Sequence, residues 1–207
     1  MRDRSFLPVR RRRLTAPGIL VLLAASAATS LAGCRTIDRT LEEARIPCGI
    51  YRWRIKTLSD TEAESVRWKP IDAAVRELAS VSSPAWFDRR RRNANEFYVY
   101  RVKAILAEVH TRLDQDLHLL LRDPVDPEAR MVAEIPNPLC TKESRHESAF
   151  AAARREAQFL RARHSETLVE VIGVGFFDEF HEARGSAPNG FELHPVLQLT
   201  ELRPSDN

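Results

Sequence analysis

Cysteine is scarce in this sequence, which has only three among its 207 residues, Cys34, Cys48 and Cys140. Structural zinc sites are built from closely spaced pairs of cysteine and histidine ligands. Neither Cys48 nor Cys140 belongs to such a spaced pair. The sequence therefore excludes a zinc finger or zinc ribbon.

A long apolar run is missing as well. The apolar stretch GILVLLAASAATSLAG (18–33) is shorter than the roughly 20 residues that a membrane-spanning helix needs. It follows six arginines (Arg2, Arg4 and Arg10 to Arg13) and ends in small residues, which is the arrangement of a secretory signal. We therefore expect residues 1–33 to be an export signal and not a spanning helix.

The end of this segment, Leu31-Ala32-Gly33-Cys34, resembles the lipobox of bacterial lipoproteins. The resemblance implies cleavage before Cys34 and acylation of its thiol. Each buried methylene of an acyl chain contributes about 0.8 kcal/mol, so several chains hold a protein at the membrane surface. Arg35 follows the cysteine in place of aspartate, and the same resemblance then favours the outer membrane. We expect a lipid-anchored protein of the bacterial cell envelope, on its periplasmic or surface face. The alternatives are an ordinary secretory signal and an uncleaved interfacial anchor.

An excess of positive charge disappears with the signal. The whole sequence has 32 basic and 29 acidic residues, of which residues 1–33 hold six arginines and Asp3, leaving 26 and 28, a net charge of −2. Domains that bind nucleic acid by electrostatics alone present a basic surface, which the mature chain therefore lacks. The run Arg89 to Arg92 could contact phosphates, lipid headgroups or an envelope partner, although such runs are more often solvated linkers.

Acylation of Cys34 leaves Cys48 and Cys140 as the single possible disulfide pair, in a compartment that permits disulfides. A bridge across a loop of this length stabilises a fold by about 4 kcal/mol on the loop-entropy estimate. We expect it to join the N-terminal segment to the later domain.

Changes of composition divide the chain into a tether (34–47), a small N-terminal α/β segment (48–95), a barrel domain (96–202) and a tail (203–207). In the N-terminal segment, YRWRIKT alternates like a strand with one buried face. SDTEAESV and IDAAVRELASV predict two short helices, the second with Ile71, Val75 and Leu78 on one stripe.

The barrel domain shows three strand patterns, one helix pattern and two further strand patterns. The strands are FYVYRVKAILAEVH, DLHLLLRDP, RMVAEIP, TLVEVIGVGFFDEF and FELHPVLQL. The helix, SRHESAFAAARREAQFLRAR, has a capping box of Ser144 and Glu147 and a buried face of Phe150, Ala153, Ala157 and Leu160. The fold class is α+β, mainly β: a five-stranded OB-like barrel with a helix between strands 3 and 4. A mixed sheet with one helix on its face has the same element string.

Strict alternation predicts which strand residues face the interior. In the second strand these are Leu117, Leu119 and Leu121, with Asp116, His118 and Arg122 outside. In the last strand these are Leu193, Leu197 and Leu199, with Glu192, His194 and Gln198 outside.

Polar residues gather in two loops that lie together at the ligand-binding end of an OB barrel. TRLDQDLH supplies Arg112, Asp114, Asp116 and His118, and FFDEFHEARGSAPNG supplies Asp178, His181 and Arg184, followed by Glu192 and His194. We therefore predict a candidate ligand or metal rim of Asp114, Asp116, His118, Asp178, His181, Glu192 and His194.

Two chemistries suit such a rim. A divalent cation, held by carboxylates and imidazoles, would bridge the acidic rim to a phosphate. Alternatively, a histidine and a carboxylate would act as general acid and base on water, with Arg112 or Arg184 stabilising the anion. Both favour either a nucleotide or nucleic-acid ligand or a phosphoester substrate.

The same residues also suit structural roles. His194 precedes Pro195, where an edge or bulge is expected and a histidine often caps a carbonyl. Asp116 and Glu192 occupy outward positions that any polar residue could fill. The role of Asp178 and His181 could be merely to fix the shape of their loop. His110, His146 and His164 lie among charged neighbours, as ordinary surface histidines do.

The blocks RWRIKT, DQDLHLLL, AEIPNPLC, GVGFFDEFH and APNGFELHPVL resemble, in this order, a group of uncharacterised bacterial exported proteins. The resemblance covers most of residues 48–199 and implies a shared fold without an assigned activity. After His181 this chain has Glu182 and Ala183, where the group typically has glycine and glutamine. The element order also resembles the staphylococcal nuclease branch of OB folds, but that family's catalytic arginines and carboxylates have no matching motif here.

We therefore expect a lipid-anchored envelope protein with an OB-like binding or scaffolding domain. A metal-assisted phosphodiesterase or nuclease that uses the rim is the alternative. A third reading is an envelope assembly partner that uses the Arg89 to Arg92 run.

Overall fold

The computed structural model describes residues 48, 51–85, 90, 91, 93–178 and 185–203. These residues belong to one compact unit, 41–207. The predicted signal, the lipidation site Cys34, the tether, His181, Arg184 and two residues of the arginine run (Arg89 and Arg92) lie outside the described residues. Within the described part, no helix has both the length and the apolar character to cross a membrane.

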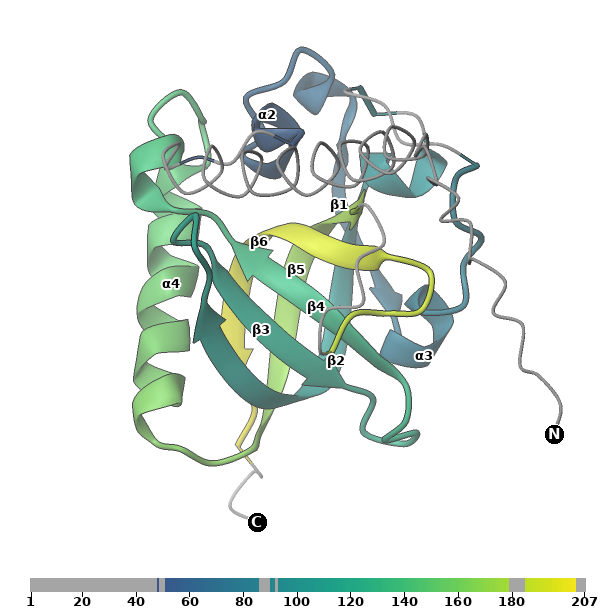
Figure 1. Ribbon diagram of the computed structural model, residues 1–207, viewed down its shortest axis with the longest axis vertical. Coiled ribbons are helices and arrows are strands. Elements are labelled where there is room, and N and C mark those ends of the chain that lie inside the picture. Colours follow the sequence, from purple (N-terminus) through teal and green to yellow (C-terminus); the bar gives the residue numbers. More distant parts are fainter. Residues whose placement is uncertain (1–47, 49–50, 86–89, 92, 179–184, 204–207) are drawn as a thin grey trace, which may run out of the picture. The chain divides into compact units, whose positions relative to one another are not determined.

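Five strands form a closed barrel (Figure 1): β2 (Tyr98–Thr111), β3 (Leu117–Arg122), β4 (Arg130–Ile135), β5 (Thr167–Phe177) and β6 (Phe191–Glu201). Their order is β2-β3-β4-β6-β5, and β5 pairs with β2 to close the sheet. The pair β4–β6 is parallel and the other barrel pairs are antiparallel. The helix α4 (Glu147–Ala162) follows β4 and precedes β5. The predicted OB-like barrel, with its helix between the third and fourth strands, is confirmed.

The first barrel strand is long because it belongs to both sides of the barrel. Its N-terminal part, Val99 to Leu106, pairs with β5, and its C-terminal part, Ile105 to Thr111, pairs with β3. The register shifts between Leu106 and Glu108, as in a β-bulge. Bulges increase the local bend and twist of a strand, which lets one strand serve both neighbours.

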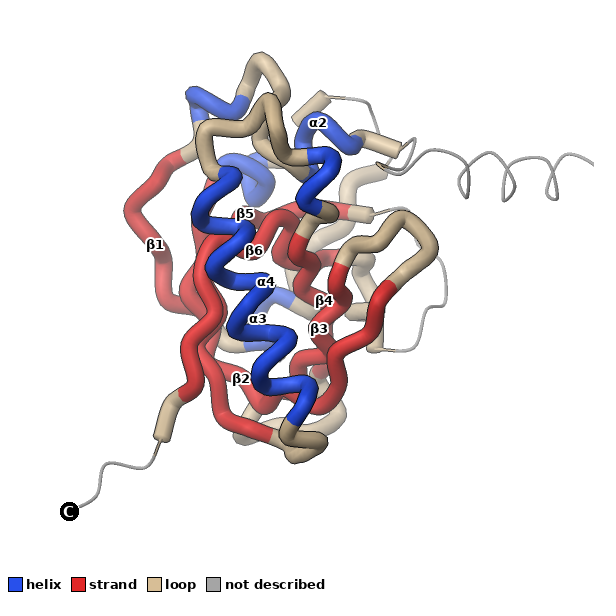
Figure 2. The backbone as a smooth tube through the Cα atoms, turned by 90° about the vertical axis from the view of Figure 1, so that its left-hand side faces the viewer, coloured by secondary structure: helices blue, strands red, loops and turns tan. Residues whose placement is uncertain are grey.

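The barrel interior follows the alternation predicted for β3, since Leu117, Leu119 and Leu121 are all buried in the main core. The helix α4 lies along the barrel strands (Figure 2). Its predicted face is confirmed, because Phe150, Ala153, Ala157 and Leu160 are its buried residues.

The predicted capping box at the start of α4 is wrong. The N-cap residue is His146, with no side-chain cap, and the Ser144 hydroxyl accepts a hydrogen bond from the His146 amide instead. The helix therefore starts later than the box requires, and Ser144 shapes the turn before it.

The N-terminal segment differs most from its prediction. YRWRIKT contains the short helix α2 (Trp53–Lys56) and not a strand. A 3₁₀ turn, η1 (Ala63–Ser65), precedes a strand that the patterns did not indicate, β1 (Arg67–Ala73), which pairs in parallel with β2. Seven alternating residues do not define a strand when tertiary contacts favour another conformation.

The segment IDAAVRELASV is divided between two elements. Its first residues complete β1, and only Val75–Leu78 forms the helix α3. Ile71, predicted to lie on the buried stripe, is 43% exposed. β1 lies at the edge of the sheet and is mostly exposed, so it lacks the buried face that makes a strand recognisable from its sequence.

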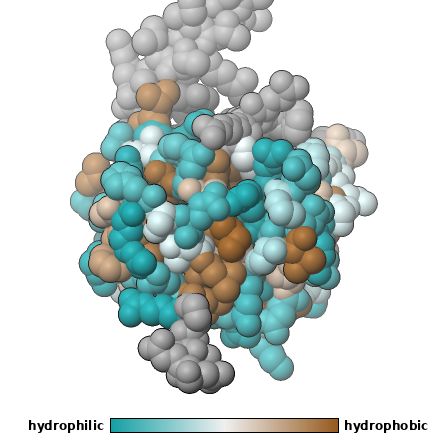
Figure 3. All heavy atoms as spheres, turned by 90° about the horizontal axis from the view of Figure 1, so that it is seen from below, coloured by the Kyte–Doolittle hydropathy of each residue, from teal (hydrophilic) through white to brown (hydrophobic). Residues whose placement is uncertain are grey.

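Large apolar side chains are exposed at Trp68, Ile71, Leu113, Val125, Leu139, Phe159 and Leu168. On the face seen from below, apolar groups are interspersed with polar ones (Figure 3). Scattered exposed apolar residues are normal for a folded domain.

A disulfide joins Cys48 to Cys140, as predicted from the cysteine count. Cys140 ends the short turn η3 (Pro138–Cys140) that follows β4. The bridge therefore connects the chain just before α2 to the chain just after β4.

A buried ion pair also joins the N-terminal segment to the barrel. Arg52 binds Glu96 through its two terminal guanidinium nitrogens, at 2.8 and 2.9 Å, and each side chain is 2% exposed. Arg52 also donates to the Phe177 carbonyl at 2.8 Å, and Glu96 accepts from the Phe177 amide at 3.2 Å. Glu96 lies in the 3₁₀ turn η2 (Ala94–Phe97), which approaches β5 so closely that a Cβ at Gly175 would lie 2.3 Å from the Asn95 oxygen.

The outward and inward assignments in the last strand are partly wrong. Leu193 and Leu199 belong to the main core, but Leu197 packs on a second cluster with Leu58, Val66 and Val174. The β5–β6 register shifts twice, next to Gly173, and these shifts interrupt the alternation on which the prediction depended.

Candidate functional site

Seven ionisable side chains form one group, which we call the acid–imidazole cluster: Lys56, Asp116, His118, Glu134, Asp178, Glu192 and His194. His118 and Glu134 face each other across β3 and β4, and Glu192 of β6 pairs with Val132 of β4. These positions alternate with core residues such as Leu117, Leu119 and Leu193. The cluster therefore occupies the face of β3, β4 and β6 opposite the barrel interior.

His194 is at the centre of the cluster and is fully buried. Its Nδ1 lies 2.9 Å from a Glu134 oxygen and 3.2 Å from a Glu192 oxygen. On the other side of the ring, Nε2 lies 3.6 Å from Asp116 Oδ2. Phe176 packs beside the ring, with 5.7 Å between the ring centroids. Glu192 and His194 were predicted to point outward, and both are buried because neighbouring side chains cover this face.

The loop between β2 and β3 positions Asp116. Asp116 Oδ1 accepts a hydrogen bond from the Asn137 amide at 2.6 Å. The Asn137 side chain donates to the Asp114 carbonyl, and Asp114 Oδ1 accepts from the Asp116 amide at 3.1 Å. Asp114, a predicted rim residue, therefore fixes the loop conformation around Asp116.

A second imidazole, that of His118, also contacts the Glu134 carboxylate. His118 Nε2 lies 2.6 Å from Glu134 Oε1, and the His118 side chain is 15% exposed. The Glu134 carboxylate thus binds one imidazole with each oxygen, His118 through Oε1 and His194 through Oε2.

The helix α2 brings a cation to the cluster. Lys56 Nζ lies 3.7 Å from Asp178 Oδ2 and 5.2 Å from the centroid of the Phe176 ring. Burial would lower the pKa of Lys56, but the charges of Glu134, Asp178, Glu192 and Asp116 outweigh it and raise the pKa above its usual value. Lys56 therefore stays protonated and offsets part of the negative charge.

The carboxyl groups of the cluster do not ionise equally. Burial raises the pKa of Asp116 well above its usual value, and the neighbouring Asp114 and Glu134 raise it further. Burial likewise raises the pKa of Glu192, together with the charges of Glu134 and Asp178. For Glu134, burial would raise the pKa, but His194, Lys56 and His118 lower it well below its usual value. Glu134 is thus the strongest acid of these three.

Burial favours the neutral form of the central imidazole. Burial lowers the pKa of His194, and this effect exceeds the increase caused by Glu134. A neutral imidazole has one N–H donor and one nitrogen lone pair. Because carboxylate oxygens of Glu134 and Glu192 surround Nδ1, the N–H belongs on Nδ1 and the lone pair on Nε2.

The structure brings together five of the seven predicted rim residues: Asp116, His118, Asp178, Glu192 and His194. Asp178 and Asp116, from the two different loops, both interact with Lys56, so the loops end on the same side of the barrel. Asp114 has the loop role described above, and His181 lies outside the described residues.

Sequence reasoning missed two members of the cluster. Glu134 occupies an alternate position in AEIP and pairs with His118, so the strand alignment would have indicated it. Lys56 gives no such signal, because it lies in a segment whose alternation predicts a strand.

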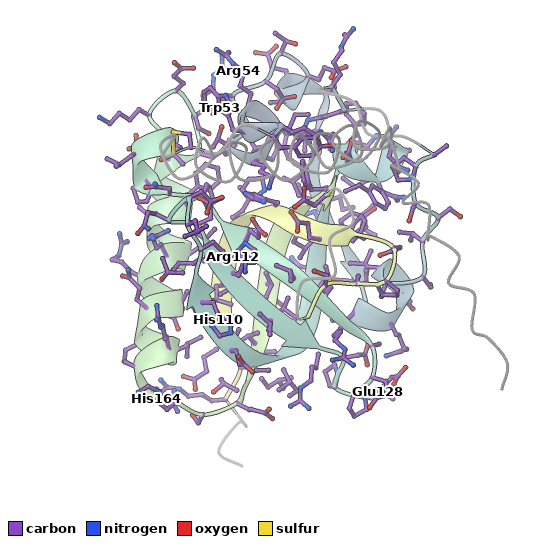
Figure 4. The ribbon with its side chains drawn as sticks, viewed as in Figure 1. Trp53, Arg54, His110, Arg112, Glu128 and His164 are labelled. Carbon is purple, nitrogen blue, oxygen red and sulfur yellow. A yellow bond between two sulfur atoms is a disulfide. The ribbon has the colours of Figure 1, made fainter. Side chains whose placement is uncertain are left out.

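The remaining histidines lie elsewhere. His110 is 49% exposed and pairs with Glu108, and His146 stacks on Trp68 with 4.5 Å between the ring centroids. In Figure 4, His164 lies at the opposite end of the molecule from Trp53 and Arg54 of α2.

Three members of the cluster could together hold a metal ion. Asp116, Glu134 and His194 each offer one ligand atom, and these atoms lie within 4.8 Å of one another. Carboxylate oxygen and imidazole nitrogen are both ligands of divalent metal ions.

No protein-family model matches the chain, and no curated protein matches its sequence. A putative aspartyl-tRNA synthetase from Leishmania major Friedlin is similar in structure, with a TM-score of 0.41 and 12% sequence identity. The similarity covers 68% of this chain but only 22% of the synthetase.

Proposed function

We propose that this chain is a lipid-anchored protein of the bacterial cell envelope whose OB-like barrel is a binding module. The acid–imidazole cluster is the proposed ligand-binding centre. Its burial carries the proposal: Asp116, Glu134, Glu192 and His194 are all at most 7% exposed. Burying ionisable groups costs stability, and strongly shifted pKa values concentrate at functional sites.

The position of the cluster supports this assignment. OB barrels bind their ligands on the face of the second and third strands and on the adjoining loops. Here these strands are β3 and β4, which carry His118 and Glu134, and the adjoining loops carry Asp116 and Asp178. The surplus of carboxylates favours a ligand that is cationic or that binds through a cation.

If the cluster serves binding, removing one crowded carboxyl group should stabilise the protein without its ligand. Glu192→Gln is expected to raise the free energy of unfolding by about 1 kcal/mol, because it removes the cost of burying an ionisable carboxyl group as well as its repulsion from Glu134 and Asp178. For a domain of this size the melting temperature should rise by roughly 2–4 °C in thermal unfolding.

Glu170→Gln is the matched control, because Glu170 is a partly exposed acid that pairs with Arg101 away from the cluster. Its stability should change by less than about 0.5 kcal/mol. A Glu192→Gln variant that melts at a lower temperature than the wild type would identify the cluster as a stabilising scaffold and contradict the proposal.

The lipid anchor is tested separately. Cys34→Ser removes the proposed acylation site, so the variant should move from the membrane fraction to the soluble fraction of cells. Cys48→Ser with Cys140→Ser is the control that also replaces cysteines but should leave the protein in the membrane fraction. Retention of Cys34→Ser in membranes would argue against lipidation.

The second candidate function is a metal-assisted phosphodiesterase or nuclease. The arrangement Asp116–His194–Glu134 favours it, since an imidazole between two carboxylates can activate water. Metal-dependent cleavage of single-stranded DNA, RNA or a simple phosphodiester, lost in both His118→Ala and His194→Ala, would favour this function over a binding module.

A further inference from the structure

One nitrogen of the cluster has an unusual environment. His194 Nε2 is buried and has no hydrogen-bond partner among the described residues. Nearly all buried polar atoms in folded proteins are hydrogen-bonded, and an unsatisfied one costs about 1–3 kcal/mol. Such an atom in the centre of a polar cluster calls for an explanation.

The atom opposite Nε2 does not provide a partner. It is Asp116 Oδ2, at 3.6 Å, which is beyond hydrogen-bond distance. The other oxygen of this carboxylate already accepts from the Asn137 amide. With the ring N–H on Nδ1, the facing atoms are a nitrogen lone pair and a carboxyl oxygen. Both atoms are of types that bind metal ions, and they face each other at 3.6 Å.

We propose that the cluster of Asp116, Glu134 and His194 binds a divalent transition-metal ion between His194 Nε2 and Asp116 Oδ2. Two ligands that each lie about 2.1 Å from one ion at a tetrahedral angle are roughly 3.4 Å apart. The separation of 3.6 Å between these atoms is close to that value. This inference rests on the proposed ligand-binding role of the cluster and names its ligand.

Glu134 orients the ligand His194 through the ring nitrogen that does not bind the ion. Its Oε2 accepts from His194 Nδ1 at 2.9 Å, which holds the tautomer with a free lone pair on Nε2. Histidines that bind metals usually donate their second N–H to a carboxylate in this way. With Asp116 and His194 as the protein ligands, further positions on the ion remain for water or for a bound molecule.

The ligand types indicate the class of metal. Imidazole nitrogen favours Zn²⁺ and its transition-metal neighbours, whereas Ca²⁺ and Mg²⁺ prefer oxygen ligands alone. Zn²⁺ and Mn²⁺ are therefore the probes of choice, with Mg²⁺ expected to bind more weakly.

A substitution of Lys56 distinguishes a metal site from a purely structural cluster. Its ammonium group lies 3.7 Å from Asp178, and its charge also interacts electrostatically with Asp116 and Glu134. A metal ion at the site would be repelled by this charge. Lys56→Met should therefore bind metal about tenfold more tightly, on the Coulomb energy expected at this depth.

In the experiment, the metal-free full chain is titrated with Zn²⁺ alone and with Mn²⁺ alone. Binding is measured by calorimetry and by the rise in melting temperature that the metal causes. The wild type should bind one ion saturably, and His194→Gln should lose this binding. Glu134→Gln should bind about 10–100-fold more weakly, as expected when a carboxylate behind a ligand histidine is removed. His110→Gln is the control, because His110 is exposed and lies outside the cluster.

Three results would overturn the inference: no saturable binding to the wild type, unchanged binding to His194→Gln, or equal loss in His110→Gln. If His194→Gln does not fold, Lys56→Met decides, since weaker or unchanged binding in that variant contradicts the site. If no metal binds but Glu192→Gln is more stable than the wild type, the metal site is refuted and the proposed binding module still stands.

Discussion

Glu96→Gln is expected to destabilise the protein by about 3–5 kcal/mol, although the substitution hardly changes the size of the side chain. The Arg52 guanidinium would remain buried, at 2% exposure, after losing its anionic partner. Breaking one side of a buried ion pair leaves an uncompensated charge, which costs far more than the intact pair contributes. In thermal unfolding, the melting temperature should fall by roughly 10 °C.

The control for Glu96→Gln is Asp72→Asn, which breaks the exposed pair of Arg101 and Asp72. Its effect should stay below about 1 kcal/mol, because solvent already screens that pair. The double variant Arg52→Met with Glu96→Leu should be more stable than Glu96→Gln, since neither charge remains buried. A loss of less than about 1 kcal/mol in Glu96→Gln would show that the pair does not hold the N-terminal segment on the barrel.

Loss of the disulfide is expected to cost about 4 kcal/mol, because the bridge joins residues 92 positions apart and restricts the unfolded chain. The double variant Cys48→Ser with Cys140→Ser should show this loss in denaturant unfolding. The bridge lies between the chain that enters α2 and the turn that follows Asn137. Its loss should therefore loosen both Lys56 and the Asn137 amide that binds Asp116.

The bridge itself can be checked by mass spectrometry of the denatured, unreduced protein after alkylation. Neither Cys48 nor Cys140 should react before reduction, and both should react after it. The Cys34→Ser variant is the control, since it should retain the bridge and its stability. Two alkylated thiols before reduction would refute the pairing.

The barrel was predictable because its signals are local. Leu117, Leu119 and Leu121 alternate on β3, and Phe150, Ala153, Ala157 and Leu160 share a helical face, so each pattern indicates both an element and its buried side. The order of these elements, three strands, one helix and two strands, then matches an OB-like barrel, and the same order also fits a mixed sheet with one helix. The disulfide was predictable because only one pair of cysteines remained after Cys34.

The N-terminal segment was not predictable in the same way. The helix α2 has only four residues, and what holds it is the pairing of Arg52 with Glu96 across 44 positions of sequence. No local pattern in YRWRIKT contains that contact. β1 escaped prediction because an exposed edge strand has no buried face to produce alternation.

The position of the cluster was only partly predictable from the sequence. Because loop position follows from strand order, the sequence predicts that one side of the barrel carries Asp116, His118, Asp178, Glu192 and His194. Whether these side chains face water depended on packing with residues far away in sequence, and Lys56 of α2, which pairs with Asp178, is one such residue. Burial raises the pKa values of Asp116 and Glu192, whereas His194, Lys56 and His118 lower that of Glu134. Both effects arise from packing between distant segments, and only the folded chain contains those contacts.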